Sequence, residues 1–121
     1  MQNFYVVRKD GLQVPLHLEV ADTALKRQQG LMNITQLNDR HGMYFKFDKP
    51  GYFYFWMRNT LIPLDILFLN EVGTILCIKQ GVPHDDKTML GCDQEAMSAI
   101  ELYAGTAKKY NIQPGDKVVE Y

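Results

Sequence analysis

Four polar side chains stand inside the most apolar stretch of this chain, and their types are the ones best suited to chemistry. The stretch reads YFYFWMRNTLIPLDILFLNEVG over residues 52–73, and it holds Trp56, Arg58, Asn59 and Asp65. An arginine two residues after a tryptophan on an extended segment can stack on the indole, which is worth roughly 0.5–2 kcal/mol. The same guanidinium can bind a carboxylate or a phosphate through two parallel hydrogen bonds. This pattern predicts a site for a small polar or anionic ligand, such as a sugar-like molecule.

Two further charged residues, Arg27 and Glu101, complete the candidate ligand-binding set. Asp65 belongs to it because a buried carboxylate without a partner costs several kcal/mol; it needs a guanidinium, backbone donors or a wet cavity. Arg27 lies near the end of a predicted helix, where the helix dipole alone would also favour an arginine. Strand alternation places Glu101 on one face with Ala99 and Tyr103, and that face could equally be solvated.

Three other interpretations of these residues stay open. Asp65 and Glu101 could serve a glycosidase-like hydrolase as a catalytic pair if their carboxyl groups lie ~5–9.5 Å apart. The charged groups could instead form a buried ion network with a structural role alone. Exposed aromatic residues could form the docking face of an assembly protein, the candidates being Tyr52, Tyr54 and Tyr121. Spacing along the chain does not decide whether the protein is an enzyme.

Other kinds of site lack the residue spacing that they require. The three histidines, His17, His41 and His84, do not have the spacing of metal ligands, and the PHDD run at 83–86 is typical of a solvated turn. The chain has no nucleophile elbow, phosphate-binding loop or dinucleotide fingerprint. We therefore expect neither a metal site nor a cofactor.

The two cysteines are predicted to be free thiols. Cys77 lies in an apolar strand, and Cys92 follows Gly91 in a polar loop. With 14 residues between them, a bridge is topologically allowed. Nothing in the sequence indicates an oxidising compartment, however, where such bridges persist.

Length and charge limit the classes of partner. A chain of 121 residues, 46% hydrophobic, suits one domain over residues 1–121. Its net charge of −1 gives no electrostatic footprint for nucleic acid and no polybasic segment for a membrane surface. No apolar run reaches the ~18 residues that a membrane-spanning helix requires. The start of the chain lacks the pattern of a secretion signal, which predicts a cytoplasmic location, although a processed exported chain would look the same.

Strand-like alternation between turn signals predicts the fold class. Asp10-Gly11 is a strong hairpin dipeptide, Asp22 can cap a helix that runs to about Gln29, and Gly30 can end it. One or two helical turns are expected over 105–110. The expected strands are 4–9, 12–20, 43–47, 52–58, 62–69, 74–80, 98–103 and 117–121. This pattern predicts a mainly β protein, a small antiparallel β barrel or sandwich with two short helices, and the main alternative is an α+β domain whose first helix covers a sheet.

Alternation also sorts the side chains of the expected strand at 52–58 into two faces. The first face looks like core and holds Phe53, Phe55, Met57 and Asn59. The second is an aromatic row that ends in a guanidinium and holds Tyr52, Tyr54, Trp56 and Arg58. The second face is therefore the expected ligand face.

Six ordered motifs resemble a known family, catalogued as domain of unknown function 192. They are Arg-Gln-Gln-Gly-Leu-Met at 27–32, Gly-Met-Tyr-Phe at 42–45, Phe-Trp-Met-Arg-Asn-Thr at 55–60, Ile-Pro-Leu-Asp at 62–65, Glu-Leu-Tyr-Ala-Gly at 101–105 and Gly-Asp at 115–116. The resemblance covers residue 12 to the end and implies a compact, mostly β domain. It implies no activity, since none is established for the family. Many members carry an export signal that this chain lacks, and the loop at 81–97 matches no family pattern, so neither location nor ligand transfers.

Overall fold

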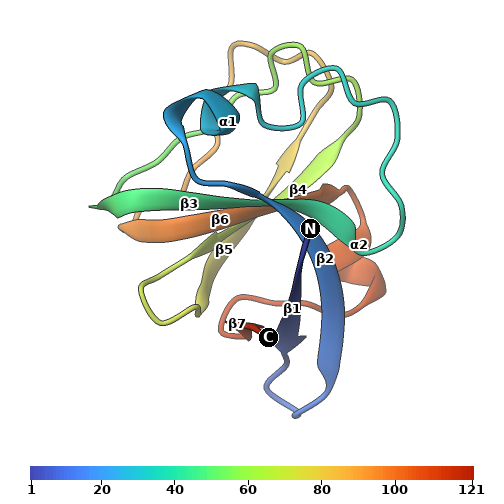
Figure 1. Ribbon diagram of the computed structural model, residues 1–121, viewed down its shortest axis with the longest axis vertical. Coiled ribbons are helices and arrows are strands. Elements are labelled where there is room, and N and C mark those ends of the chain that lie inside the picture. Colours follow the sequence, from blue (N-terminus) through green and yellow to red (C-terminus); the bar gives the residue numbers. More distant parts are fainter.

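One curled sheet of seven strands organises the chain. The computed structural model describes residues 1–121 (Figure 1). The strands are β1 (Gln2–Val7), β2 (Gln13–Ala21), β3 (His41–Gly51), β4 (Leu64–Leu69), β5 (Ile75–Gly81), β6 (Ala96–Tyr103) and β7 (Lys117–Glu120), and the helices are α1 (Ala24–Gln29) and α2 (Thr106–Lys109). The mainly β class with two short helices is confirmed. Neither helix has the length and hydrophobicity that crossing a membrane would require.

The strand order corrects one part of the prediction, because the sheet is mixed. The order is β5-β4-β6-β3-β2-β1-β7. Five of the six neighbouring pairs are antiparallel, but β2 and β3 run parallel, with His17 opposite His41. A parallel pair needs a crossover connection, and here α1 and the turns after it, residues 22–40, provide it.

The curl brings the two ends of the sheet together into a half-barrel. Thr74, the residue before β5, forms an isolated bridge with Lys117 of β7. The Val118 N–H donates to the Gly73 carbonyl and the Ile75 N–H to the Asp116 carbonyl, each at 2.8 Å. These bonds satisfy backbone groups that an open sheet edge would leave unpaired.

The predicted hairpin turn and the predicted end of the first helix are confirmed. The Asp10-Gly11 turn joins antiparallel β1 and β2, with Gly11 at φ 88°. Helix α1 ends at Gly30, whose φ of 49° lies in the left-handed region that favours glycine. The helix begins one residue later than expected, because the Thr23 hydroxyl, and not Asp22, accepts the capping hydrogen bond from the Lys26 N–H.

Two hydrophobic clusters lie on opposite faces of the sheet. The inner cluster fills the curl and draws Phe4, Leu16, Leu67 and Ile100 from strands at both ends of the sheet. The outer cluster includes alternate residues of the same strands, such as Ile66 and Ala99, with Met57 and Leu31 packed over them. In Figure 1, α1 and the loops that cover the outer face gather at the top of the view, away from β1 and β7. Because both faces of β4 are covered, all six of its residues are buried.

The segment from Tyr52 to Pro63 corrects a second prediction, because it is not a strand of the sheet. It runs along the outer face, and its one ladder contact is the isolated bridge between Phe55 and Leu90 of the following loop. The predicted alternation of its side chains is nevertheless confirmed from Tyr52 to Arg58, whereas Asn59, predicted on the core face, is exposed because a left-handed turn begins there. Tyr52, Tyr54, Trp56 and Arg58 are exposed, whereas Phe53, Phe55 and Met57 are half-buried or buried. An extended backbone keeps the period of two even when its hydrogen-bond partner is a loop.

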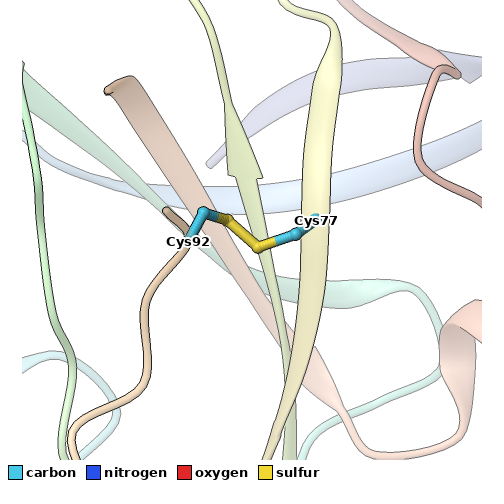
Figure 2. Close-up of a disulfide and its surroundings, with 2 residues drawn as sticks. All are labelled: Cys77 and Cys92. Atoms are coloured by element: carbon cyan, nitrogen blue, oxygen red, sulfur yellow. A yellow bond between two sulfur atoms is a disulfide. The ribbon is translucent and has the colours of Figure 1, made fainter. Parts of the chain in front are cut away.

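The cysteines correct a third prediction, because Cys77 and Cys92 form a disulfide (Figure 2). Their Cα atoms are 6.2 Å apart, which is within the usual range for a bridge. The bond ties β5 to the loop that follows it. That loop in turn pairs with Phe55, so the disulfide supports one wall of the site described next.

Candidate functional site

Glu101 is a buried carboxyl group on the outer face of the sheet. It lies in β6, opposite Met43 of β3 and Ile66 of β4, and its residue is only 4% exposed. The end of α1 covers it: a Cβ atom added to Gly30 would lie 3.7 Å from Glu101 Oε1. The alternation of β6 places Glu101 on one face with Ala99, but it does not show that α1 and its following turn leave the residue only 4% exposed.

A pocket of about 350 Å³ opens above Glu101. We call it the central pocket. Residues 27–32, the end of α1 and the turn after it, form one side, and residues 53–56 form the other. Six aromatic side chains line it: Phe45, Phe47, Phe53, Tyr54, Phe55 and Trp56. Its volume is at the lower end of the range for small-molecule sites. An aromatic wall around one carboxyl group is chemically suited to a small molecule with an apolar body and one polar group.

Burial raises the pKa of Glu101 to about 8 from its ordinary value of 4.5. No hydrogen bond or neighbouring charge offsets this effect of burial. The carboxyl group is therefore mostly protonated and neutral near pH 7. A buried polar group without a protein partner is unusual in a folded protein, and a carboxyl group that lines a pocket can find its partner in a ligand.

Arg27 lines the same pocket, but its guanidinium is already engaged. Nη1 donates to the Lys46 carbonyl at 2.9 Å, and Nη2 lies 3.5 Å from Asp48 Oδ2. These contacts tie α1 to β3, across the region above Glu101. Arg27 therefore fixes α1 against β3 beside the pocket, and its predicted contact with a ligand stays a prediction.

A second pocket adjoins the central one at Trp56. This outer pocket, about 420 Å³, shares Gln28, Gln29, Met32 and Trp56 with the central pocket and adds Arg58 and Asn59. The predicted stacking is confirmed, because Arg58 Cζ lies 5.4 Å from the centre of the Trp56 ring. Asn59 adopts a left-handed φ of 55°, and its carbonyl accepts a hydrogen bond from the Asn33 N–H at 2.9 Å. Asn59 thus fixes the turn at the edge of the pocket.

Asp65 lies on the opposite face of the sheet from Glu101. In the register of β4 and β6, Asp65 is opposite Leu102, and Glu101 is opposite Ile66. Side chains on adjacent strands whose register positions differ by one residue point to opposite faces of the sheet. The sheet therefore separates the two carboxyl groups, and the predicted catalytic pair of the hydrolase interpretation is wrong. Asp65 is also absent from the lining of both pockets.

Asp65 has a structural role at the start of α2. Its Oδ2 accepts hydrogen bonds from the Gly105 and Ala107 N–H groups at 3.1 and 3.0 Å. These are N–H groups that the first turn of a helix cannot pair internally. Asp65 thus supplies from β4 the cap that Gly105, which has no side chain, cannot provide.

Replacing Asp65 tests this assignment. We expect Asp65→Ala to lower the free energy of unfolding by about 1–3 kcal/mol, because the Gly105 N–H and the buried Ala107 N–H lose their acceptor. Urea unfolding measures the loss, and Asp22→Ala, an exposed aspartate in the β2–α1 turn, is the control. A loss below about 0.5 kcal/mol, the range of ordinary surface changes, would contradict the capping role.

The wall at residues 53–57 is held in place by the loop behind it. Phe55 and Leu90 exchange two backbone hydrogen bonds of 2.8 Å, and the Met57 N–H donates to the Asp85 carbonyl at 2.8 Å. Gly91 permits a close approach, because a Cβ atom there would lie 2.6 Å from the Phe53 carbonyl oxygen. Cys92, one residue further on, anchors the same loop to β5. The pocket wall therefore depends on the disulfide through a short chain of contacts.

Several pocket residues were not predicted from the sequence. Phe53 and Phe55 lie on the face predicted to be core, and the sequence pattern predicts no role for Gln28 and Gln29. The structure places all four against the central pocket. One available signal was the Arg-Gln-Gln-Gly-Leu-Met motif, since two amides directly before a helix-ending glycine are well placed to reach a neighbouring cavity.

The comparison with family profiles decides the identification. Residues 5–119, nearly the whole chain, match the profile of DUF192, described as "Uncharacterized ACR". The chain belongs to the DUF192 family. No curated protein matches it.

Two solved structures share the fold of this DUF192 chain. A protein from Sinorhizobium meliloti, described as a proposed transcription regulator, is 33% identical with a TM-score of 0.95; the match covers 98% of this chain and 92% of that one. A protein of unknown function from Novosphingobium aromaticivorans is 36% identical with a TM-score of 0.90, over 97% of this chain and 83% of that one. The DUF192 fold is thus shared nearly end to end, and no activity comes with it.

Proposed function

We propose that this DUF192 protein is a binding module for a small polar molecule, which occupies the central pocket and reaches the outer pocket past Trp56. An anionic group of the ligand would meet Arg58, and the body of the ligand would lie among the aromatic side chains. The observation that carries the proposal is the carboxyl group of Glu101, 4% exposed and without a protein partner, in the lining of an aromatic pocket.

The charges of the two pockets support this proposal. Arg58 is exposed, and its guanidinium has no carboxylate within ion-pair distance. The face of Trp56 orients it through the cation–π contact. A free, oriented guanidinium suits a carboxylate or phosphate, and the two side-chain amides at the junction of the pockets, Gln28 and Gln29, suit hydroxyl groups. A sugar acid carries both kinds of group.

Titration calorimetry against sugar acids and nucleotides tests the proposal. The signal can be checked by fluorescence, because Trp56 is the one tryptophan of the chain. We expect Arg58→Ala to weaken binding of an anionic ligand by roughly tenfold, the size of one good charged contact. Arg8→Ala is the matched control, since Arg8 pairs with Asp10 and lies in neither pocket.

Glu101→Leu separates a ligand-binding role from a structural one. Leucine has a similar size and no polar group, so we expect the variant to fold while binding weakens by roughly tenfold or more. If no compound binds the wild type more tightly than about 10 mM, or if Glu101→Leu binds as the wild type does, the proposal fails.

A docking role in an assembly is the second candidate, and the exposure of Tyr52 and Tyr54, 57% and 53%, favours it. The predicted docking set is not continuous, however. Tyr121 stacks on Tyr5 of β1, with ring centres 4.6 Å apart, at the other end of the sheet. Sedimentation of the purified protein at increasing concentration would detect association through the tyrosines of 52–54.

Nucleic-acid binding has weaker support. The Sinorhizobium relative is described as a proposed transcription regulator, but this chain has a net charge of −1. Proteins that bind nucleic acid without reading its sequence do so through clustered positive charge. We therefore keep the expectation that the partner is a small molecule rather than a nucleic acid or a membrane.

The cytoplasmic location stays a prediction, and the disulfide counts against it. Disulfides such as Cys77–Cys92 persist mainly in oxidising compartments. An exported location would agree better with this bond. Fractionation of cells of the source organism, with the thiols blocked before lysis, would show both the location and the state of the cysteines.

A further inference from the structure

The central pocket combines two features that together point to a positively charged ligand. The first is the aromatic wall, six side chains from β3 and from residues 53–56. The negative faces of aromatic rings attract cations, and rings arranged around a cavity are the usual means by which proteins bind quaternary ammonium groups. The second is Glu101, the acidic residue of the lining. Ionised, it would be the counter-ion of such a group.

Glu101 lacks a cation within the protein. Its carboxyl group forms no salt bridge, and no charged neighbour contributes to its titration. The elements around it are β3, β4, the end of α1 and residues 53–56, and the other charged residue that these elements bring to the pocket is Arg27. The guanidinium of Arg27 is held by Asp48 and the Lys46 carbonyl. The charge of Arg27 is therefore offset outside the pocket, and Glu101 is left unpaired.

We infer that the central pocket binds the ammonium group of an organic cation, with Glu101 as its counter-ion; this inference rests on the proposed function. A ligand with a carboxylate or phosphate a few bonds from that ammonium group would place its anionic end near Arg58 in the outer pocket. The ligand class is then an ammonium compound, zwitterionic where it fills both pockets. Sugar acids would be poorer ligands, because they bring no cation to Glu101.

Binding of this kind must release a proton below about pH 8. The carboxyl group is neutral in the free protein near pH 7 because its pKa is raised to about 8, whereas a bound cation favours its ionised form. The proton on Glu101 goes to solvent as the cation enters. The apparent affinity should therefore rise about tenfold for each pH unit between about pH 6 and pH 8, and become constant above that range.

Calorimetry with choline and with its uncharged isostere, 3,3-dimethylbutan-1-ol, tests the inference. The wild type should bind choline at least about tenfold more tightly than the alcohol at pH 8. Near pH 6, titrations in two buffers of different ionisation enthalpy should report one proton released for each choline bound. Glu101→Gln, which preserves shape, should weaken choline binding and abolish the proton release, leaving only the preference that the aromatic rings provide. Glu19→Gln on β2, an exposed glutamate, should change neither.

The possible outcomes separate this inference from the proposed function. Equal binding of choline and the alcohol, binding without proton release, or unchanged choline affinity in Glu101→Gln would each overturn the ammonium site. If choline does not bind but sugar acids do, the inference fails and the proposed function stands. If neither class binds, both fail. The proton count in the wild type needs no variant, so poor folding of Glu101→Gln would not leave the question open.

Discussion

Urea unfolding of this DUF192 protein should become easier as the pH rises from about 5 to about 8, by about 3–4 kcal/mol. Glu101 causes the change, because its pKa is about 8 in the folded protein and 4.5 is its ordinary value. In this window the unfolded chain has already lost the proton that the folded chain keeps, so stability falls as pH rises. The gap between 4.5 and about 8, at about 1.4 kcal/mol for each pH unit, sets the upper limit.

The two aspartates with lowered pKa values act outside this pH window. The pKa values of Asp39 and Asp85 are lowered, mainly by hydrogen bonds from Tyr110 and from Thr88. Carboxyl groups whose pKa is lowered in the folded protein contribute stability that disappears only in acid, below about pH 4. The part of the loss between pH 5 and pH 8 that belongs to Glu101 is the part that Glu101→Gln removes.

Glu101→Gln should remove this loss. A glutamine cannot ionise, so the variant should keep nearly constant stability from about pH 5 to pH 8 and exceed the wild type by a few kcal/mol at pH 8. Urea unfolding curves at four or five pH values measure this, with Glu19→Gln as the matched control. A wild-type curve as flat as that of Glu101→Gln would show that Glu101 is solvated or paired, and it would remove the basis of the site.

Loss of the disulfide should produce the second large effect. Cys77 and Cys92 are 15 residues apart in sequence, and closing a loop of that size stabilises a protein by about 3 kcal/mol. We expect the double variant Cys77→Ala/Cys92→Ala to lose about 2–4 kcal/mol in urea unfolding. Wild-type protein in a strong reductant should show the same loss, which controls for the removal of the thiols.

The same variant should also disturb the pocket wall. The loop that the disulfide anchors supplies Leu90, which pairs with Phe55, and Gly91, which packs on Phe53 and Tyr54. We expect the emission of Trp56 to shift towards that of an exposed indole on reduction. A stability loss below about 1 kcal/mol, well under the usual range for a native bridge, would contradict the bond as a main support of the loop. An unchanged Trp56 spectrum would contradict its link to the wall.

The fold class could be predicted because its signals are local. Asp10-Gly11 makes its own hairpin, Gly30 ends its own helix, and alternation shows which residues of 52–58 face the core. The parallel pairing of β2 with β3 has no local signal, since it depends on where the crossover at 22–40 returns the chain. The periodicity of residues 52–58 predicts a strand, because it is the same whether the partner of the segment is a strand or a loop.

The candidate site could be predicted only in part, for a related reason. Periodicity shows on which face of β4 Asp65 lies and on which face of β6 Glu101 lies. It does not give the register between two strands that have 26 residues between them in the chain, from Leu69 to Ala96. That register places the carboxyl groups on opposite faces. Tertiary contacts likewise decide that Cys92 reaches Cys77. The stacking of Arg58 on Trp56 was predictable because both belong to one short segment.

The most direct test of the central claim, that Glu101 is kept buried and unpaired for a ligand, is the titration of its side-chain carboxyl carbon by ¹³C NMR. The resonance is assigned with Glu101→Gln and followed with pH, first in the free protein and then with saturating choline. We predict a pKa near 8 in the free protein and a clearly lower value with choline bound. A titration near 4.5 in the free protein, or the same curve with and without choline, would contradict the account.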